Sequence, residues 1–380
     1  MGNRAALQAK ETILNCDEYV KSLLGDLENA KRSIELETYI FNEDSFGKKI
    51  IDVLIKAASR GVKVRLLLDG IGTSSWYDGI RKMEEGGVKV RVFNPFPLKL
   101  WQLNRTHFQS SIIFKIIYFF LRMNSRNHRK TCIIDGAIVY VGSINITQSH
   151  FSFQQGGEGW IDAVVKVTQV DLQELQFAFD IAWYGFSLNE RIKKIFKPVK
   201  KNPVFRLNYF RRQRRLLYKS LLQQIFHCQH RVWMMSAYFN PDYFLLRYLK
   251  KAAKRGRDVK ILLPHDPDVA IMSLFANAFY SSLLQGGVKI YEYLPSVIHA
   301  KMLIIDDWYC IGSSNLTQRS LIHDLEVDVN IQTNSAKKIL EKQFLDVIQG
   351  SRQLSLEDLK KLPLYKKMLS QLLLYIRYFF

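Results

Sequence analysis

The stretch NHRKTCIIDGAIVYVGSIN, residues 127–145, returns in the second half of the chain as IHAKMLIIDDWYCIGSSN, residues 298–315. Each copy contains His, one residue, Lys, four residues and Asp, followed by Gly-Ser-x-Asn. The shared positions are His128, Lys130, Asp135, Ser143 and Asn145 in the first copy and His299, Lys301, Asp306, Ser313 and Asn315 in the second. A reactive pattern that occurs twice indicates one site built from two halves.

The apolar runs 132–134 and 303–305 predict a buried strand in each copy. Since residues two apart in an extended chain share a face, the His and Lys of each copy point the same way. A histidine near its free pKa is both a nucleophile and a proton donor around neutral pH, and lysine is a compact positive charge suited to phosphate oxygens. The two copies therefore predict two sides of one phosphate-binding site.

An in-line displacement at phosphorus uses both histidines. One attacks and forms a phosphohistidine, while the other protonates the leaving oxygen. The lysines, serines and asparagines of the two motifs would bind the non-bridging oxygens and offset their charge, so neither a metal nor another cofactor is expected. A single His-x-Lys is common by chance, but two full copies with the same trailing Gly-Ser-x-Asn are not.

The doubled motif resembles that of the phospholipase D superfamily, and the order of the surrounding segments is similar to that of short bacterial cardiolipin synthases without N-terminal transmembrane helices. The segments that carry this resemblance are LETYIF (36–41), AASRGVKV (57–64), LDG (68–70), AYF (237–239) and AAKRG (252–256). The resemblance implies a phosphatidyltransferase that makes cardiolipin from phosphatidylglycerol. It also implies His128 as the nucleophile and His299 as the acid and base.

Residues 10–95 alternate between predicted strands and amphipathic helices, and residues 232–293 repeat this order. The phrases GGVKV (86–90) and GGVKI (286–290) fix the register of the duplication. This βαβ order predicts an α/β protein with two duplicated α/β/α sandwich domains, mostly parallel sheets, and an active site at the pseudo-twofold interface between them. The length of 380 residues suits two domains, which we place at 1–200 and 201–380.

Three segments combine basic and apolar side chains. An insertion around 95–126, with five basic residues and no acidic one, suits either the headgroup boundary of an anionic membrane or a buried helix packed on its domain. Residues 191–215 hold eleven Lys or Arg and no carboxylate, which indicates either a solvated face or a lipid-facing surface. The C-terminal segment 362–380 favours membrane contact.

The charge balance, 55 Lys and Arg against 35 Asp and Glu, gives a formal net charge of +20. A protein this basic favours a polyanionic partner, either an anionic phospholipid membrane with phosphatidylglycerol and cardiolipin or a nucleic acid. The apolar clusters beside the charges favour lipid over nucleic acid.

No apolar run reaches the ~20 residues needed to cross a bilayer, and the N-terminal stretch has no signal-peptide pattern. The four widely spaced cysteines form no C-x-x-C pair, which argues against a zinc site or a disulfide framework and fits a reducing compartment. We therefore expect a peripheral or monotopic protein on the cytoplasmic face of the cell membrane.

Carboxylates near the motifs have two possible roles each. Asp135 and Asp306 either accept hydrogen bonds from the histidines, as the resemblance implies, or end strands at turns. Glu326, Asp162 and, more weakly, Glu37 lie in apolar surroundings, so each either orients an imidazole or points outward from its strand. The spacing from Asp to Gly is six residues in the first copy and five in the second, which leaves the roles of the motif serines open.

Two other enzymatic functions fit the same motifs. With water as the acceptor, the chemistry gives a phospholipase D that hydrolyses lipid, and the choice depends on pocket shape and water exclusion. A phosphodiesterase or nuclease acting on nucleic acid also fits the basic charge. A non-enzymatic membrane-binding protein is disfavoured because both motifs are intact.

Overall fold

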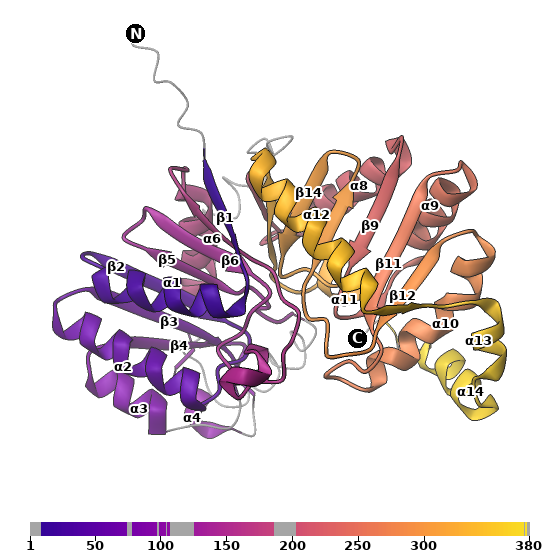
Figure 1. Cartoon of the computed structure of the whole chain (residues 1–380). Helices are drawn as coiled ribbons and strands as arrows, with labels where there is room; N and C mark the ends of the chain where they lie inside the picture. Colours follow the sequence, from indigo (N-terminus) through magenta and orange to yellow (C-terminus); the bar gives the residue numbers. More distant parts are fainter. Residues whose placement is uncertain are drawn as a thin grey trace, which may run out of the picture.

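The computed structural model describes residues 9–73, 78–96, 99–103, 105–106, 125–185, 203–375 and 377. Within them, two α/β units lie side by side, one in each half of the chain (Figure 1). Most of the insertion predicted around 95–126, the first part of the basic run 191–215 and the predicted domain boundary at residue 200 lie outside the described residues. Among the described residues, no helix combines the length and the apolar character needed to cross a membrane.

The first unit contains a seven-stranded sheet with the order β1-β7-β6-β5-β2-β3-β4. Its strands are β1 (Lys10–Leu14), β2 (Ser33–Thr38), β3 (Lys63–Asp69), β4 (Lys89–Phe93), β5 (Thr131–Ile134), β6 (Ile138–Gly142) and β7 (Val164–Thr168). Its helices are α1 (Cys16–Asn29), α2 (Ser45–Ser59), α3 (Asp78–Glu85), α4 (Leu100–Leu103), the short 3-10 turns η1 (Gln148–His150) and η2 (Phe153–Gln155), and α6 (Gln173–Tyr184).

The second unit repeats this plan in an eight-stranded sheet with the order β17-β12-β11-β9-β13-β14-β16-β8. Its strands are β8 (Phe205–Leu207), β9 (Arg231–Met235), β11 (Asp258–Pro264), β12 (Lys289–Tyr293), β13 (Met302–Ile305), β14 (Trp308–Gly312), β16 (Val327–Ile331) and β17 (Ser351–Gln353), and β10 (Phe239–Asn240) pairs separately with β15 (Leu316–Thr317). Its helices are α8 (Arg211–His227), α9 (Tyr243–Lys254), α10 (Ile271–Gln285), α11 (Gln318–Ile322), α12 (Asn334–Gln349), α13 (Leu356–Lys361) and α14 (Leu364–Leu373).

The duplicated α/β architecture is confirmed, but the expectation of mostly parallel sheets is wrong. Among the described residues of the two large sheets, parallel pairing is limited to β2, β3 and β4 and to β9, β11 and β12. The remaining neighbours are antiparallel, because each motif strand returns directly through a hairpin instead of a helical crossover. As β5 is antiparallel to β2, the residues just before β5 lie at the carboxyl end of β2, where α/β sheets place their ligands.

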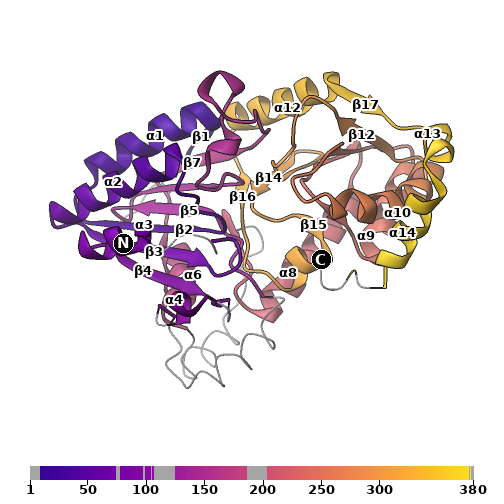
Figure 2. The same cartoon turned by 90° about the horizontal axis from the view of Figure 1, so that it is seen from below.

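Each sheet is covered on both faces. Helices α1, α2 and α3 pack on the outer face of the first sheet, and α8, α9 and α10 pack on the outer face of the second (Figure 2). The inner faces share one hydrophobic cluster that includes Val139 and Val141 of β6, Ile311 of β14 and Val327 of β16, with α6 and α12 beside them. The two halves are therefore joined by a continuous core.

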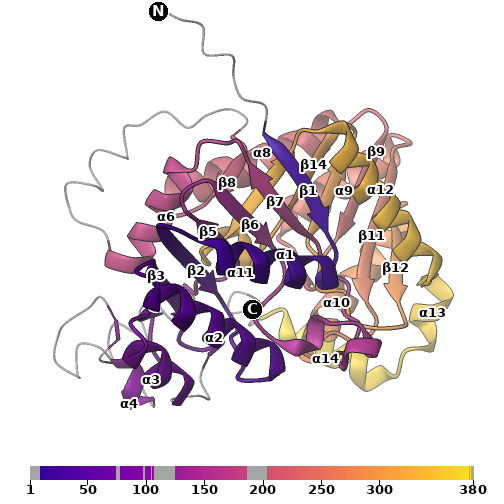
Figure 3. The ribbon, with the colours of Figure 1, turned by 60° about the vertical axis from the view of Figure 1, so that its left-hand side comes forward.

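A polar contact closes the edge of this interface. The carboxylate of Glu11, in edge strand β1, accepts hydrogen bonds from the backbone N–H groups of Gln332 (3.1 Å) and Thr333 (2.9 Å) at the start of α12. Figure 3 shows β1 at the edge of the first sheet beside β7. This contact and the shared core fix one half against the other, as a site built from two halves requires.

The motif aspartates form the hairpin turns between the paired strands. Asp135 and Asp306 have φ values of 55° and 51°, in the left-handed region that Asp tolerates better than most residues. The carboxylate of Asp306 accepts hydrogen bonds from the backbone N–H groups of Gln229, His230 and Arg231 at 2.7–3.0 Å. Asp135 binds Lys31, Arg32 and Ser33 in the same way. Both aspartates therefore tie a hairpin to the start of the neighbouring strand.

The substitution Asp306→Ala is expected to lower the free energy of unfolding by about 2–4 kcal/mol, since it removes a charged acceptor and places a methyl side chain in the left-handed region. The adjacent Asp307→Ala is the matched control, because the Asp307 side chain is 90% exposed. We expect that control to change stability by less than about 1 kcal/mol. Urea denaturation measures both, and equal effects would contradict the role assigned to Asp306.

Candidate active site

Each motif histidine is held by the opposite half of the chain. The backbone N–H of His128 donates to the carbonyl of Leu325 at 2.9 Å, and the backbone N–H of His299 donates to the carbonyl of Ile161 at 2.8 Å. Isolated parallel bridges, 127 with 325 and 161 with 298, support both contacts. The two motifs are therefore positioned by the interface between the halves.

The imidazoles meet carboxylates across the same interface. His128 Nδ1 lies 3.1 Å from both carboxylate oxygens of Glu326 and 3.0 Å from the carbonyl oxygen of Ser313. His299 Nδ1 lies 2.9 Å from Asp162 Oδ1. We call His128–Glu326 and His299–Asp162 the crossed pairs, because each joins a histidine of one half to a carboxylate of the other. The sequence predicts both carboxylates as candidates for orienting an imidazole. It does not predict that each one binds the histidine of the opposite half.

The crossed pairs also determine which ring nitrogen can react. Carbonyl and carboxylate oxygens accept hydrogen bonds, so Nδ1 carries the proton in both imidazoles. The lone pair is then on Nε2 of each ring. The site thus presents two Nε2 atoms, one from each half, for bonding to phosphorus or for proton transfer.

Hydroxyl groups hold the carboxylates in place. Ser313 Oγ and Ser320 Oγ each donate to Glu326 at 2.5 Å, and Ser143 Oγ donates to Asp162 at 2.5 Å. The single hydroxyl proton of each motif serine is therefore already committed. Binding of phosphate by Ser143 and Ser313 stays a prediction, since these hydroxyls donate to carboxylates in this structure. The unequal Asp-to-Gly spacing is taken up in the hairpin turns, so the two serines occupy equivalent places.

His150 completes the set around Asp162. Its Nδ1 lies 2.6 Å from Asp162 Oδ2, and its Nε2 accepts from the backbone N–H of Asn145 at 3.2 Å. In the second half the equivalent N–H, that of Asn315, donates to Ser320 Oγ at 2.9 Å. Sequence analysis missed both residues, although each lies five positions after its motif asparagine, a signal that aligning the two repeats would have shown.

The motif lysines are buried beside the histidines. Lys130 Nζ donates to the backbone carbonyl of His128 at 2.7 Å, and Lys301 Nζ donates to that of His299 at 2.5 Å. Burial, together with the charge of Lys301, lowers the pKa of Lys130 to about 7, and burial lowers the pKa of Lys301 to about 8. Each ammonium group retains further N–H donors for an anionic ligand.

The crossed pairs differ in charge. Burial raises the pKa of Glu326 to about 7 against the opposing effect of Lys130. Burial also acts to raise the pKa of Asp162, but His150 and His299 reverse this and hold it well below its ordinary value. Burial and the lysines lower the pKa of His128 well below the ordinary range and that of His299 to about 3, while Asp162 partly offsets the shift of His299. Both imidazoles are therefore neutral in the free site, and only His299 faces a fully ionised carboxylate.

The other predicted carboxylates lie elsewhere. Glu37 accepts from Asn127 Nδ2 at 3.0 Å and Thr131 Oγ1 at 2.8 Å, so it fixes the motif strand and the expectation that it orients an imidazole is wrong. Asp135 and Asp306 bind backbone groups at the hairpins, so their predicted place in the active-site network is also wrong. Both aspartates instead position the strands that follow the histidines.

The asparagines differ from the serines. Asn145 Oδ1 accepts from the backbone N–H of Ile40 at 3.2 Å, which orients the amide. Asn315 Oδ1 is buried and has no hydrogen-bond partner among the described residues. A role for these two amides in binding phosphate stays a prediction.

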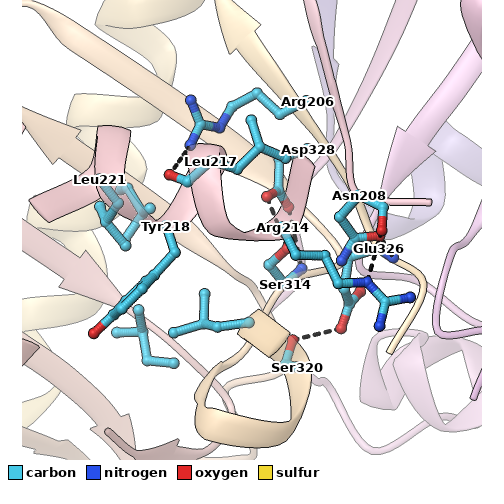
Figure 4. A pocket seen from close by; sticks show the side chains of 13 residues that line it. Arg206, Asn208, Arg214, Leu217, Tyr218, Leu221, Ser314, Ser320, Glu326 and Asp328 are labelled. Carbon is cyan, nitrogen blue, oxygen red and sulfur yellow. Dashed lines mark hydrogen bonds between the residues drawn. The ribbon is translucent and has the colours of Figure 1, made fainter. Parts of the chain in front are cut away.

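Residues of the basic run 191–215 hold the segment that carries Glu326 in place. Asn208 Oδ1 accepts from the backbone N–H of Glu326 at 2.6 Å, and Arg214 Nε donates to the carbonyl of Asn208 at 2.7 Å (Figure 4). A cavity of about 40 Å³ lies beside these residues. Arg206 also lines this cavity and donates to the carbonyl of Leu217 at 3.0 Å. Both arginines thus bind backbone carbonyls of the protein itself. For these two residues of the basic run, neither the predicted solvated face nor the predicted lipid-facing surface is found.

Three side chains are close enough to ligate a metal ion. The possible ligand atoms of His150, Asp162 and His299 lie within 4.8 Å of one another. These atoms are hydrogen-bonded to each other at 2.6 and 2.9 Å, which accounts for their proximity.

Known proteins are similar to this chain in sequence over most of its length. The family model described as "Cardiolipin synthase, PLD-like domain" matches residues 23–183 and 221–348. A cardiolipin synthase of Clostridium perfringens is 30% identical over 356 residues, which cover 90% of this chain and 70% of that protein. Cardiolipin synthase B of Salmonella typhimurium is 31% identical over 343 residues, covering 88% and 79%.

The fold has a counterpart among solved structures. The phosphatidylserine synthase of Haemophilus influenzae superposes with a TM-score of 0.69 at 16% identity, over 97% of this chain and 93% of that one. This likeness shows the shared fold, and the resemblance predicted from the doubled motif is confirmed. The chain belongs to the phospholipase D-like family that includes the cardiolipin synthases.

Proposed function

We propose that this protein is a phosphatidyltransferase that makes cardiolipin and glycerol from two molecules of phosphatidylglycerol at a membrane surface. The observation that carries this proposal is the pair of buried histidines with Nε2 lone pairs, each oriented by a carboxylate from the opposite half. The relatives that are named cardiolipin synthases support synthesis of this lipid over action on nucleic acid.

In the first step, His128 Nε2 attacks the phosphorus of one phosphatidylglycerol. The P–N bond forms, the bond to the glycerol oxygen breaks, and that oxygen takes a proton from His299 as glycerol leaves. In the second step, His299 removes the proton from a hydroxyl of the second phosphatidylglycerol. That oxygen attacks phosphorus, the P–N bond breaks, and cardiolipin is released with both histidines restored.

The unequal charges of the crossed pairs support this division of roles. A general acid must carry a proton, so His299, neutral in the free site, takes up a proton on Nε2 when the anionic substrate binds. The ionised Asp162 and the bound phosphate both stabilise this imidazolium form, which then supplies the proton to the leaving oxygen. A nucleophile must stay neutral, and Glu326, with its pKa near 7, stabilises a charged His128 less. Lys130, Lys301 and the amides of Asn145 and Asn315 would bind the non-bridging oxygens.

Incubation with phosphatidylglycerol vesicles is expected to give cardiolipin and glycerol, identified by mass spectrometry. The substitution His128→Ala should lower product formation by at least about 10³-fold, because it removes the nucleophile. Phosphatidic acid as the main product would show that the protein is a hydrolase and not a transferase. Turnover of DNA or RNA without lipid turnover would refute the assignment of a lipid substrate.

A phosphatidyl adduct trapped by rapid denaturation at mildly alkaline pH, where a P–N bond survives, should map to the peptide that contains His128. An adduct on the peptide of His299 would reverse the two roles while leaving the reaction itself unchanged.

The pH dependence should reflect the motif lysines. As pH rises through about 7 to 8, Lys130 and Lys301 lose the positive charges that bind phosphate, so kcat/KM is expected to fall on the alkaline side. Vesicle binding measured at the same pH values separates loss of membrane attachment from loss of chemistry. A kcat/KM that stays constant to about pH 9.5 would exclude these lysines as the titrating groups.

A further inference from the structure

Helix α14 presents an apolar face to solvent. Leu364, Met368 and Leu372 follow each other at four-residue intervals and are 72%, 59% and 60% exposed. This spacing puts all three on one side of the helix. On the other side, Leu373 packs against Met272 and Phe275 of α10. An exposed apolar surface of this kind marks an interaction site.

A cavity of about 400 Å³ lies between α14, α13 and α10. Lys360, Lys366 and Lys367 line it together with leucines of α13, and none of its described lining residues is acidic. Lys367 Nζ donates to the carbonyl of Lys360 at 2.9 Å, which holds this ammonium group beside α13. The lining therefore combines positive charge with apolar surface, as an anionic lipid requires.

A second feature indicates a polar ligand in this cavity. Ser370 lines it, is only 3% exposed, and its Oγ has no hydrogen-bond partner among the described residues. A buried hydroxyl without a partner costs free energy, so such groups in folded proteins generally have a ligand or a structural reason. A phosphate oxygen would accept this hydrogen bond.

The chain after α14 leads back toward the second motif. Beyond the helix, the carbonyl of Arg377 accepts from Asn240 Nδ2 at 3.0 Å. Asn240 belongs to β10, which pairs with β15 directly after the motif residue Asn315. Figure 2 shows α14 beside α10 toward the outer edge of the second unit, with β15 nearer the first unit. The chain after α14 therefore connects the helix to the strand that follows the second motif.

We propose that α14 and the cavity beneath it form a docking site for anionic phospholipid in a bilayer. The phosphate binds the lysines and Ser370 in the cavity, and the apolar face of α14 enters the acyl region. This inference rests on the proposed function, and it specifies which surface of the protein contacts the bilayer that holds the substrate.

The test measures sedimentation of the protein with vesicles of phosphatidylcholine alone or mixed with phosphatidylglycerol. The triple substitution Leu364→Ser, Met368→Ser and Leu372→Ser is expected to weaken binding to the mixed vesicles by at least about tenfold, because it removes the apolar contact. The matched control is Ile339→Ser with Leu345→Ser on α12, whose side chains are similarly exposed (50% and 38%) but lie on a different helix. Equal binding by the triple variant and the wild-type protein would overturn the proposal.

Ser370→Ala tests the cavity itself. Removal of an unpartnered buried hydroxyl should leave stability unchanged or raise it, whereas loss of a phosphate contact should lower the preference for phosphatidylglycerol over phosphatidylcholine several-fold. An unchanged preference would overturn the cavity as the headgroup site. Binding is measured in the His128→Ala background, so that turnover does not change the lipid composition. Activity is measured separately with His128 present. A protein that binds the vesicles but makes no cardiolipin would refute the proposed function and leave the docking site unaffected.

Discussion

The crossed pairs are the interaction on which the rest of the structure depends. Neither motif histidine is paired with a carboxylate of its own half, because His128 uses Glu326 and His299 uses Asp162. The shared core between the inner sheet faces, and the contact of Glu11 with α12, keep these side chains within hydrogen-bonding distance. The duplication thus yields one site, and its two histidines are inequivalent because Asp162 is ionised and Glu326 titrates near 7.

The hairpins explain why the motif has its spacing. Four residues of strand separate the lysine from the aspartate, and the aspartate begins the turn that reverses the chain. The serine after the second strand then returns to the interface, where it donates to the carboxylate of its own half. Residues that share a motif therefore act at opposite ends of one hairpin. The aspartate lies at the turn, whereas the histidine, the lysine and the serine lie at the open end beside the interface.

Much of this could be predicted from local patterns. The duplication, the strands and helices, and the histidines and lysines of the site are visible as repeated sequence. The histidine partners of Glu326 and Asp162 could not be predicted from the sequence, because they depend on how the two halves of the chain pack. Ser143 and Asp135 were assigned to phosphate binding and to the active-site network, yet their hydrogen bonds go to Asp162 and to backbone groups. His150 was missed because nothing in its local sequence shows that Asp162 lies beside it.

The central claim is that each catalytic imidazole is oriented by the other half of the chain. NMR of the protein with ¹⁵N-labelled histidine measures this directly, through the hydrogen-bonded Nδ1–H of His128 and of His299. We expect Glu326→Gln to shift the His128 signal and leave that of His299 in place, and Asp162→Asn to shift the signals of His299 and His150. If Glu326→Gln instead shifted His299 and spared His128, the crossed arrangement would be wrong.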